Sequence, residues 1–566
     1  MTDWFASTSA PLTELVATSQ SAPPQTGNGA LRRAFGIACG LMLAIGATYV
    51  VPGLGALRPW APGSGYVPFW NVIGRELLGE GKALAVEAQK LRELQQKTEL
   101  PVAASAPVRE RAGRPPRPVF PTYAPGAHIE RPETGIEFSE ALEAYFTKLT
   151  LVDLGIDGAI ARTGHWGDSV LGMDGITSGI RRRLQTRFGD AGHGFHLIDR
   201  YHPSYRQQGI EFTPGGGWEG CLVINECRAK QDRRYGYGGY VVSSDPWSVA
   251  SAVYSTPKKG FGSTVSTFEV WFQRQPRGGK LELGIDRQEK VVIDTRAEVV
   301  EDGSRMVYVP PGPHTFTLTV PSGAGAVRAY GVVLENDGPG VVWDGMALIG
   351  GSTRGLRTQD DEHVEDQVRR RGLDLIAFQF GGNDLARKYV DLKDSMQPYY
   401  DEYGEVVRKF RAGRPEASCL ILSVIDHGER KADDRIVTKS FVKRLVQAQR
   451  EVARQNGCAF FDTFEAMGGE GSAARWYRSN PRMMAPDLGH PTGTGHEVLA
   501  GLISHALLYD YDQFRERMAG KPLPLPAEKA PEKPPIDLDA LPDVPPAAAS
   551  VQGAAGDVAT RAGSTP

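Results

Sequence analysis

Two motifs of this sequence contain side chains that could cooperate in nucleophilic chemistry. GDSV (167–170) precedes an apparent helix, which places Ser169 at a strand-to-helix turn with its backbone N–H at a helix N-terminus. DLGHP (487–491) carries Asp487 and His490 three positions apart in one loop. A serine hydroxyl is a weak nucleophile until a histidine removes its proton, and the histidine needs a carboxylate to fix its tautomer. These residue types therefore fit acyl transfer.

Two further motifs could supply the hydrogen-bond donors that a tetrahedral intermediate requires. IGG (349–351) follows an apolar run, and glycine there lets a backbone N–H approach a ligand closely. GGND (381–384) follows the run LDLIAFQF, so Asn383 is predicted at the carboxyl end of a strand, where α/β sheets bind ligands. Backbone N–H groups and an asparagine amide can both act as such donors. Each motif alone also fits an ordinary turn or surface loop, and it is the order of all four at strand ends that favours catalysis.

The elements that must position these motifs read as an α/β domain in two segments, 136–204 and 341–520. Continuous apolar runs of the kind found in buried parallel strands alternate with helical stretches there. The strand-like runs are LDLIAFQF (373–380), SCLILSVI (418–425) and GCAFFDTF (457–464), and a helix with a glycine stop is predicted over 439–457.

Residues 205–340, here called the β insert, differ from these two segments in their sequence pattern. Short β-type runs such as STFEVWFQRQ and HTFTLTVP are separated by Gly, Pro and Asp turns. An all-β, sandwich-like module is therefore predicted to interrupt the α/β domain. Its aromatic residues could form either a sugar-stacking surface or a buried core; they are Trp218, Tyr235, Tyr237, Trp247 and Trp271.

The N-terminal region predicts a membrane anchor. Residues 1–31 read as a cytoplasmic tail, and 32–58 as a transmembrane anchor or signal, in which an arginine pair precedes an uncharged run over 34–57 that is long enough to cross a bilayer core of roughly 30 Å. The letters RRAFG also resemble a twin-arginine export signal, which would be cleaved. Residues 59–135 follow as a helix and Pro-rich linker, and 521–566 as a disordered Pro/Ala-rich tail. We expect a single-pass protein of the cell inner membrane with its catalytic domain on the periplasmic or extracytoplasmic side.

Composition narrows the partners and cofactors. The chain has 64 Lys plus Arg against 67 Asp plus Glu, a net charge of -3, which gives no reason to propose nucleic acid as a partner. No Cys/His spacing resembles a zinc site, and no metal or cofactor is expected. Cys221 and Cys227 could pair if the region is exported, whereas Cys419 and Cys458 are expected as buried thiols.

In the order GDS, Gly, GxND and DxxH, the four motifs resemble the SGNH hydrolase family, the GDSL-type esterases. The resemblance implies a flavodoxin-like three-layer α/β/α domain, with Ser169 as nucleophile, His490 as general base and Asp487 as its orienting partner. It also implies an oxyanion hole formed by the N–H groups of Ser169 and Gly350 and the side chain of Asn383.

Alternatives remain at two of these positions. Gly351 is adjacent to the predicted glycine and could serve instead. His496 is a rival base, but it falls inside an apparent helix, where a structural role is expected. Asp168 is expected to make structural hydrogen bonds at the serine turn, and Asp426 and His427 could line the site, although a structural role is favoured for them.

A β module between the serine and glycine motifs is similar to that of bacterial peptidoglycan O-acetylesterases, whose insert resembles a carbohydrate-binding module. This resemblance implies a serine esterase that removes O-acetyl groups from an acetylated cell-envelope polysaccharide, with peptidoglycan as one candidate. Two alternatives remain: a sugar O-acetyltransferase with the same triad, and a glycan-binding envelope protein with a scaffold hydrolase domain.

Overall fold

The structure is a computed structural model that describes residues 119–123, 129–225, 227, 231–286, 290–386 and 395–524. The predicted cytoplasmic tail and membrane segment, most of the predicted linker and most of the C-terminal tail lie outside these residues. Within the described ranges, no helix combines the length and the apolar character that crossing a bilayer requires.

A six-stranded sheet carries the catalytic motifs. Its strand order is β1-β19-β16-β15-β2-β14, and every neighbouring pair is parallel except the antiparallel pair of β1 with β19. All residues of β15 and β16 are buried, which confirms the reading of their apolar runs as interior parallel strands. The strands are β1 (Ile136–Glu137), β2 (Ile160–Gly167), β14 (Gly340–Ala347), β15 (Leu375–Gln379), β16 (Ser418–Leu422) and β19 (Ala459–Phe461).

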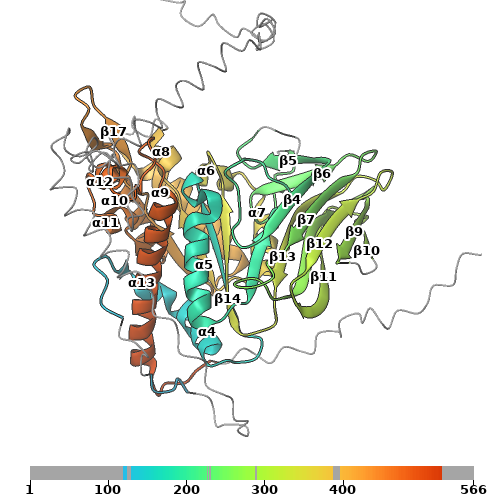
Figure 1. Ribbon diagram of the computed structural model, residues 1–566, viewed down its shortest axis with the longest axis horizontal. Coiled ribbons are helices and arrows are strands. Elements are labelled where there is room, and N and C mark those ends of the chain that lie inside the picture. Colours follow the sequence, from blue (N-terminus) through green and yellow to red (C-terminus); the bar gives the residue numbers. More distant parts are fainter. Residues whose placement is uncertain are drawn as a thin grey trace, which may run out of the picture. The chain divides into compact units, whose positions relative to one another are not determined.

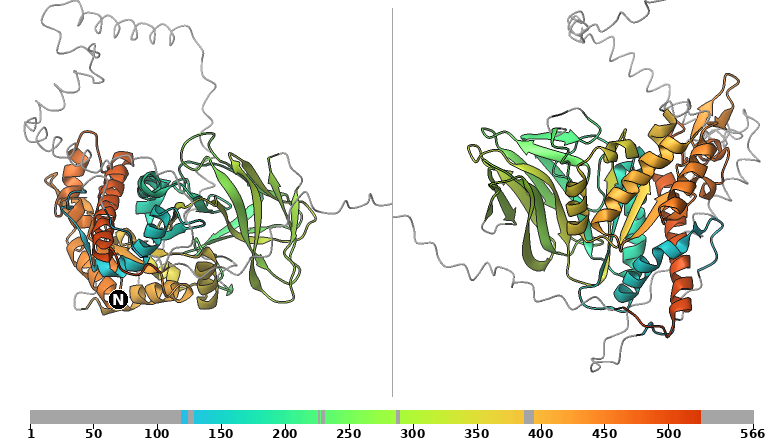
Figure 2. Two further views of the ribbon diagram at one scale, coloured as in Figure 1. Left: turned by 90° about the horizontal axis from the view of Figure 1, so that it is seen from below. Right: turned by 180° about the vertical axis from the view of Figure 1, so that it is seen from behind.

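Helices cover both faces of this sheet (Figures 1 and 2). α5 and α13 pack together on one face, while α7, α9 and α10 lie on the other. α5 buries Ile176, Ile180, Leu184 and Phe188, a four-residue spacing that keeps one helix face toward the sheet. The helices are η3 (Ser139–Leu142), α4 (Glu143–Asp153), η4 (Ser169–Asp174), α5 (Gly175–Phe188), α6 (Thr353–Arg357), α7 (Asp361–Arg371), α8 (Gly382–Ala386), α9 (Gln397–Gly413), α10 (Val442–Gln455), α11 (Thr463–Ala466), α12 (Ser472–Arg478) and α13 (Gly493–Met518).

Two antiparallel sheets are inserted between β2 and β14 of the parallel sheet (Figure 1). Their apolar faces meet at Phe268 and Phe316, whose rings stack with centroids 4.9 Å apart. The five-stranded sheet is β10 (Val291–Asp294), β9 (Lys280–Ile285), β12 (Thr315–Val320), β7 (Ala250–Ser255) and β4 (Glu211–Gly216). The six-stranded one is β11 (Glu301–Gly312), β8 (Val265–Arg274), β13 (Arg328–Glu335), β6 (Tyr240–Ser244) and β5 (Trp218–Leu222), with β3 (Gly192–His196) on β13.

β3 precedes residue 205, where the β insert was predicted to begin, yet it pairs with β13 of the antiparallel sheet. Glycine makes this strand possible. Gly194 has φ +81°, and a Cβ there would meet the Asp344 carboxylate at 2.0 Å. The backbone of β3 therefore passes directly beside a buried acid of β14.

Buried charges join the two kinds of sheet. Arg371 of α7 donates from Nε to Asp344 Oδ2 at 2.7 Å and forms an ion pair with Glu335 of β13 at 2.7 Å. Arg162 of β2 binds the same Glu335 at 2.7 Å. Asp344 also accepts from the N–H of Phe195 in β3 at 3.0 Å and from the Tyr237 hydroxyl at 2.9 Å. Nearly every polar atom of this buried cluster is thus paired, as burial of charge requires.

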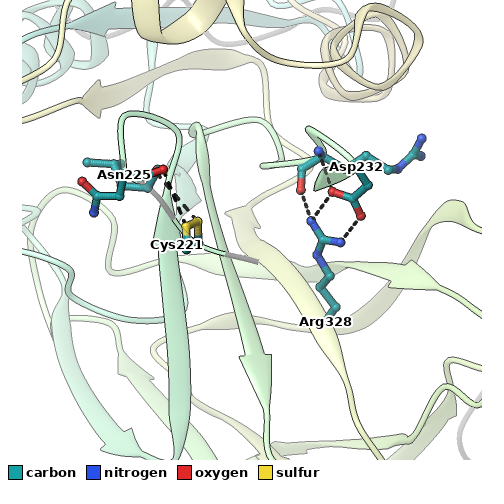
Figure 3. The surroundings of a disulfide bond; sticks show 7 residues. Cys221, Asn225, Asp232 and Arg328 are labelled. Atoms are coloured by element: carbon teal, nitrogen blue, oxygen red, sulfur yellow. Dashed lines mark hydrogen bonds and ion pairs between the residues drawn. A yellow bond between two sulfur atoms is a disulfide. The ribbon is translucent and has the colours of Figure 1, made fainter. Parts of the chain in front are cut away.

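Disulfides fix two further regions. Cys221, at the end of β5, is bonded to Cys227 in a loop, and the nearby Asp232 pairs with Arg328 of β13 (Figure 3). Cys419 is bonded to Cys458, so the expectation of two buried thiols at these positions is wrong. The pairing joins the starts of the adjacent parallel strands β16 and β19, which their separation of 39 residues in sequence does not reveal.

We predict that Glu335→Gln lowers stability in a pH-dependent way. Burial alone would raise the pKa of Glu335, but the charges of Arg162 and Arg371 outweigh it and lower this pKa to about 2. A lowered folded-state pKa stabilises the protein above the ordinary value near 4.5, and this contribution, at most about 3 kcal/mol, is lost as pH falls toward 2.

The measurement is the thermal midpoint of wild type and variant between pH 7 and pH 3. The variant should melt lower at pH 7 by about 5 °C or more, and the gap should narrow as pH falls. Glu301→Gln, which removes an exposed ion pair with Arg274, is the control and should change little. A gap of constant size across this pH range would contradict the prediction.

Candidate functional site

Ser169 lies where β2 ends and η4 begins, and Asp168 holds this turn in place. The Asp168 side chain accepts hydrogen bonds from the N–H groups of Val170 (2.9 Å), Gly381 (3.1 Å) and Gly382 (2.9 Å). Burial raises the pKa of this carboxyl, against the opposing effect of those N–H donors. Asp168 thus ties the serine turn to the loop after β15, in agreement with the structural role expected for it.

Ser169, His490 and Asp487 form a continuous chain of hydrogen bonds. Ser169 Oγ lies 2.8 Å from His490 Nε2, and His490 Nδ1 lies 2.7 Å from Asp487 Oδ2. The other carboxylate oxygen of Asp487 accepts from the N–H groups of Gly489 (3.0 Å) and His490 (3.1 Å). Partial burial opposes ionisation of Asp487, but these donors and the imidazole outweigh it and hold its pKa below the usual range. A carboxylate that stays ionised can fix the histidine with Nδ1–H toward it and Nε2 free to accept a proton.

Asn383 is the second residue of α8 and lines the same pocket as these three groups. Its side-chain amide donates to the carbonyl of Gly351 at 2.7 Å, which uses one of the two N–H bonds of that nitrogen. The N–H of Gly351 donates to Leu348 O at 2.7 Å, whereas the N–H of Gly350 has no acceptor in the described part of the chain. Of the two candidate glycines, Gly350 is therefore the one whose N–H is available to a ligand; its φ of +80° favours glycine.

A pocket of about 220 Å³ opens over Ser169. Ser169, Asn383, Asp487 and His490 all line it, and Gly350 lies outside its wall. The other lining residues are Asp168, Val170, Gln379, Phe380, Gly382, Val424, Ile425, His427, Lys439 and Gly489. The pocket is half-open to solvent, since the side chains of His490 and Asp487 are 47% and 56% exposed.

Tyr201 supports the loop that carries Gly350, a role that no motif of the sequence predicts. Its hydroxyl donates to Ala347 O at 2.5 Å and accepts from the N–H of Ile349 at 3.2 Å. Ser204, three residues further on, accepts from the N–H of Met173 in η4 at 2.7 Å. The segment that leads from β3 into the β insert thus contacts both the glycine loop and the serine turn. A lone tyrosine in a loop follows no period, so only the tertiary fold reveals its role.

The other candidates named in the sequence analysis, His496, Asp426 and His427, take no part in this chain of hydrogen bonds. His496 is buried in α13 against Gly175, and burial lowers its pKa to about 4. Asp426 accepts from Thr438, Ser472 and Ala473 beneath the site, whereas His427 does line the pocket.

Among the aromatic residues of the β insert, Tyr235, Tyr237 and Trp271 are core residues, Trp218 is half-buried and Trp247 is 81% exposed. In the part of the chain described here, no group of three or more His, Cys, Asp or Glu side chains is placed to hold a metal ion.

This geometry predicts selective phosphorylation of Ser169 by an organophosphorus reagent. Diisopropyl fluorophosphate should modify one serine per chain, detected by intact mass and located by peptide mapping, because only a hydroxyl next to a proton acceptor is activated. Ser169→Ala should abolish labelling, and His490→Ala should slow it by at least about 10³-fold. His505→Ala is the histidine control, since His505 lies on α13, its Nε2 is hydrogen-bonded to Glu130 O, and it is not among the residues that line the pocket. Equal labelling of Ser169→Ala and wild type would refute the assignment.

Comparison with known proteins finds one family model that matches part of this chain. Residues 315–498 match the model of the GDSL-like lipase/acylhydrolase family, a span that contains Gly350, Asn383, Asp487 and His490 and omits Ser169. No curated protein matches the chain.

A solved structure of a peptidoglycan O-acetylesterase is similar over 67% of this chain and 99% of its own, with 19% identity and a TM-score of 0.55, which shows a shared fold. An acetylxylan esterase from Geobacillus stearothermophilus (20% identity, 30% of this chain, 74% of its own, TM-score 0.22) and a family 3 carbohydrate esterase from Talaromyces cellulolyticus (16%, 31%, 73%, 0.22) match less of the chain.

The family match begins within the β insert, at β12, and covers most of the second segment of the parallel-sheet domain, while the serine motif at residue 169 lies before the insert. Residues 315–498 thus match the GDSL-like lipase/acylhydrolase family, and β2, the strand that leads to Ser169, lies in the same parallel sheet as this segment.

Proposed function

We propose that this chain is a serine O-acetylesterase that acts on an acetylated cell-envelope polysaccharide through an acetyl-enzyme at Ser169. The observation that carries the proposal is the Ser169–His490–Asp487 hydrogen-bond chain at the wall of an open pocket. No metal ion or organic cofactor takes part in the proposed reaction.

In the first half-reaction, Ser169 Oγ attacks the acetyl carbonyl carbon while His490 Nε2 takes the hydroxyl proton. The new Oγ–C bond forms a tetrahedral intermediate, and Asp487 stabilises the imidazolium. When the intermediate collapses, the bond to the sugar oxygen breaks and His490 gives its proton to that oxygen. Water then attacks the acetyl-enzyme, with His490 again as the base, and acetate leaves as Ser169 regains its proton.

The negative oxygen of both intermediates needs donors, and three are proposed. They are the N–H of Ser169, the N–H of Gly350 and the second N–H of the Asn383 amide. The hydrogen bond from Asn383 to Gly351 O supports this assignment, because it fixes the amide and the glycine loop relative to each other before substrate arrives.

Solvent access to the triad favours hydrolysis over acetyl transfer to a second sugar. A transferase has to keep water away from its acyl-enzyme. Here the side chains of His490 and Asp487 are about half exposed, so water can reach the ester.

The substrate and location rest on weaker support. The shared fold with a peptidoglycan O-acetylesterase, including two antiparallel sheets that we propose form a carbohydrate-binding sandwich, favours an acetylated glycan, with peptidoglycan as the first candidate. Two disulfides are typical of an oxidising compartment outside the cytoplasm. Together with the uncharged run 34–57, they support a protein of the inner membrane whose catalytic domain faces the periplasm.

The test is hydrolysis of p-nitrophenyl acetate, propionate and butyrate by the full chain, followed by acetate release from O-acetylated peptidoglycan and from acetylxylan. We expect a preference for acetyl and loss of at least about 10³-fold in kcat for Ser169→Ala and His490→Ala. Activity in both variants equal to that of wild type would overturn the proposed triad, and a wild-type chain inactive on every ester would overturn the proposed function.

Asn383→Ala should lower kcat about 10²- to 10³-fold with a smaller effect on KM, since an oxyanion donor acts mainly in the transition state. Steady-state kinetics on p-nitrophenyl acetate measure the split, and the thermal midpoint checks that the variant is folded. A rise in KM at unchanged kcat would instead assign Asn383 to ground-state binding.

A further inference from the structure

Lys439 is a half-buried cation in the wall of the catalytic pocket. It follows β18 (Ile436–Thr438) of a two-stranded hairpin whose first strand is β17 (Gly428–Arg430). Its backbone N–H donates to His427 O at 2.8 Å, and Gly428 N–H donates to Leu488 O at 2.8 Å. These bonds fix the hairpin, and with it Lys439, to the loop that carries Asp487 and His490.

No carboxylate among the described residues forms an ion pair with Lys439. The acids around it have other partners. Asp168 and Asp487, which also line the pocket, bind backbone N–H groups and His490. Asp426 accepts from Thr438, Ser472 and Ala473. The remaining acids of the hairpin and the nearby helices pair with other cations: Glu429 with Lys431, Asp433 with Arg435, Asp434 with Arg430 and Glu470 with Lys443. Partial burial of an unpaired ammonium is costly, and a bound anion would offset that cost.

His427 presents a free acceptor in the same wall. Its Nδ1 lies 3.0 Å from Ile425 O, and because a carbonyl can only accept, Nδ1 carries the proton. Burial lowers the pKa of His427 to about 4, so near neutral pH the ring is uncharged and Nε2 has a lone pair. The ring packs between the loops of Gly382 and Gly489, where added Cβ atoms would lie 3.1 Å from Nε2 and from Cδ2 respectively. In the described part of the chain Nε2 has no donor.

We propose that Lys439 and His427 form a subsite for a carboxylated sugar beside Ser169. The Lys439 ammonium binds the carboxylate, and His427 Nε2 accepts a hydrogen bond from a hydroxyl of the same sugar. The subsite rests on the proposed esterase function and narrows its substrate to an acidic glycan. Two sources share this chemistry: the lactyl carboxylate of a muramyl residue that carries no stem peptide, and the carboxylate of a uronic acid.

The first experiment compares two esters that differ in one charge, 4-acetoxybenzoate and its neutral methyl ester. The ratio of their kcat/KM values, anionic over neutral, is measured for the full chain and should fall about 10-fold in Lys439→Met, because a charge-assisted contact is lost. Lys439→Arg keeps the charge and should retain most of the ratio. Lys443→Met, which removes an exposed lysine paired with Glu470, should leave it unchanged.

The ratio separates this inference from the proposed function. If wild type hydrolyses both esters and Lys439→Met keeps the wild-type ratio, the subsite is refuted while the esterase stands. If wild type hydrolyses neither ester, the proposed function falls, and the subsite is then decided by binding alone.

The binding measurement uses calorimetry on Ser169→Ala with four sugars: N-acetylmuramate and glucuronate, and the neutral N-acetylglucosamine and glucose. The carboxylated sugars should bind more tightly, and Lys439→Met should remove that advantage. His427→Ala should weaken the charged and neutral sugars alike. Preference for N-acetylmuramate or for glucuronate identifies the source of the carboxylate. Equal binding of charged and neutral sugars by the wild-type subsite would overturn the proposal.

Discussion

Arg371 is fully inside the protein, between a parallel sheet and an antiparallel one, and its charge has to be compensated there. Asp344 from β14 and Glu335 from β13 do so, and the pKa of Arg371 is raised well above its usual value, because its two acids outweigh the cost of burial. The guanidinium in turn compensates the buried charges of both acids, together with Arg162 at Glu335. β13 and β14 are consecutive strands, so this cluster fixes the point at which the chain passes from one sheet to the other. The position of β14 in turn determines where the loop with Gly350 begins.

The catalytic end of the sheet is organised on the same principle, by one buried acid. The Asp168 carboxylate accepts hydrogen bonds from the N–H groups of Val170, Gly381 and Gly382. The serine turn and the asparagine loop therefore share a single acceptor. A Cβ at Gly167 would lie 2.5 Å from Gln379 O, which shows how closely the two strands approach before the site. Such an arrangement keeps donors and nucleophile in place before substrate binds, and preorganisation of this kind is the main source of electrostatic catalysis.

Sequence reasoning identified the parallel sheet because strands such as β15 and β16 lie in continuous apolar runs. The runs 373–380 and 418–425 are long enough and apolar enough to predict interior strands, and the motif GGND follows the first of them. It singled out Ser169 and Asn383 because each follows a strand, and Asp487 and His490 because they stand three positions apart in one loop. It missed β3, whose sequence GHGFH combines two glycines with two histidines and has little strand propensity. It also missed Tyr201, Lys439 and the Cys419–Cys458 bond, since each depends on which loops and strands become neighbours.

The contacts of Tyr201 limit where segments of this chain can be deleted or exchanged with those of another protein. Because its hydroxyl bridges Ala347 and Ile349, the segment entering the β insert acts as scaffolding for the glycine loop. A shortened enzyme that joins β2 and α5 directly to β14 would lose these two hydrogen bonds of Tyr201. It would also lose Glu335, so that Arg371 would keep only Asp344 as its acidic partner. The β insert therefore cannot be removed or replaced as a whole without affecting the parallel-sheet domain. Chimeras that exchange the β insert between related proteins should cross over inside it, beyond Tyr201 and Ser204 and before β13.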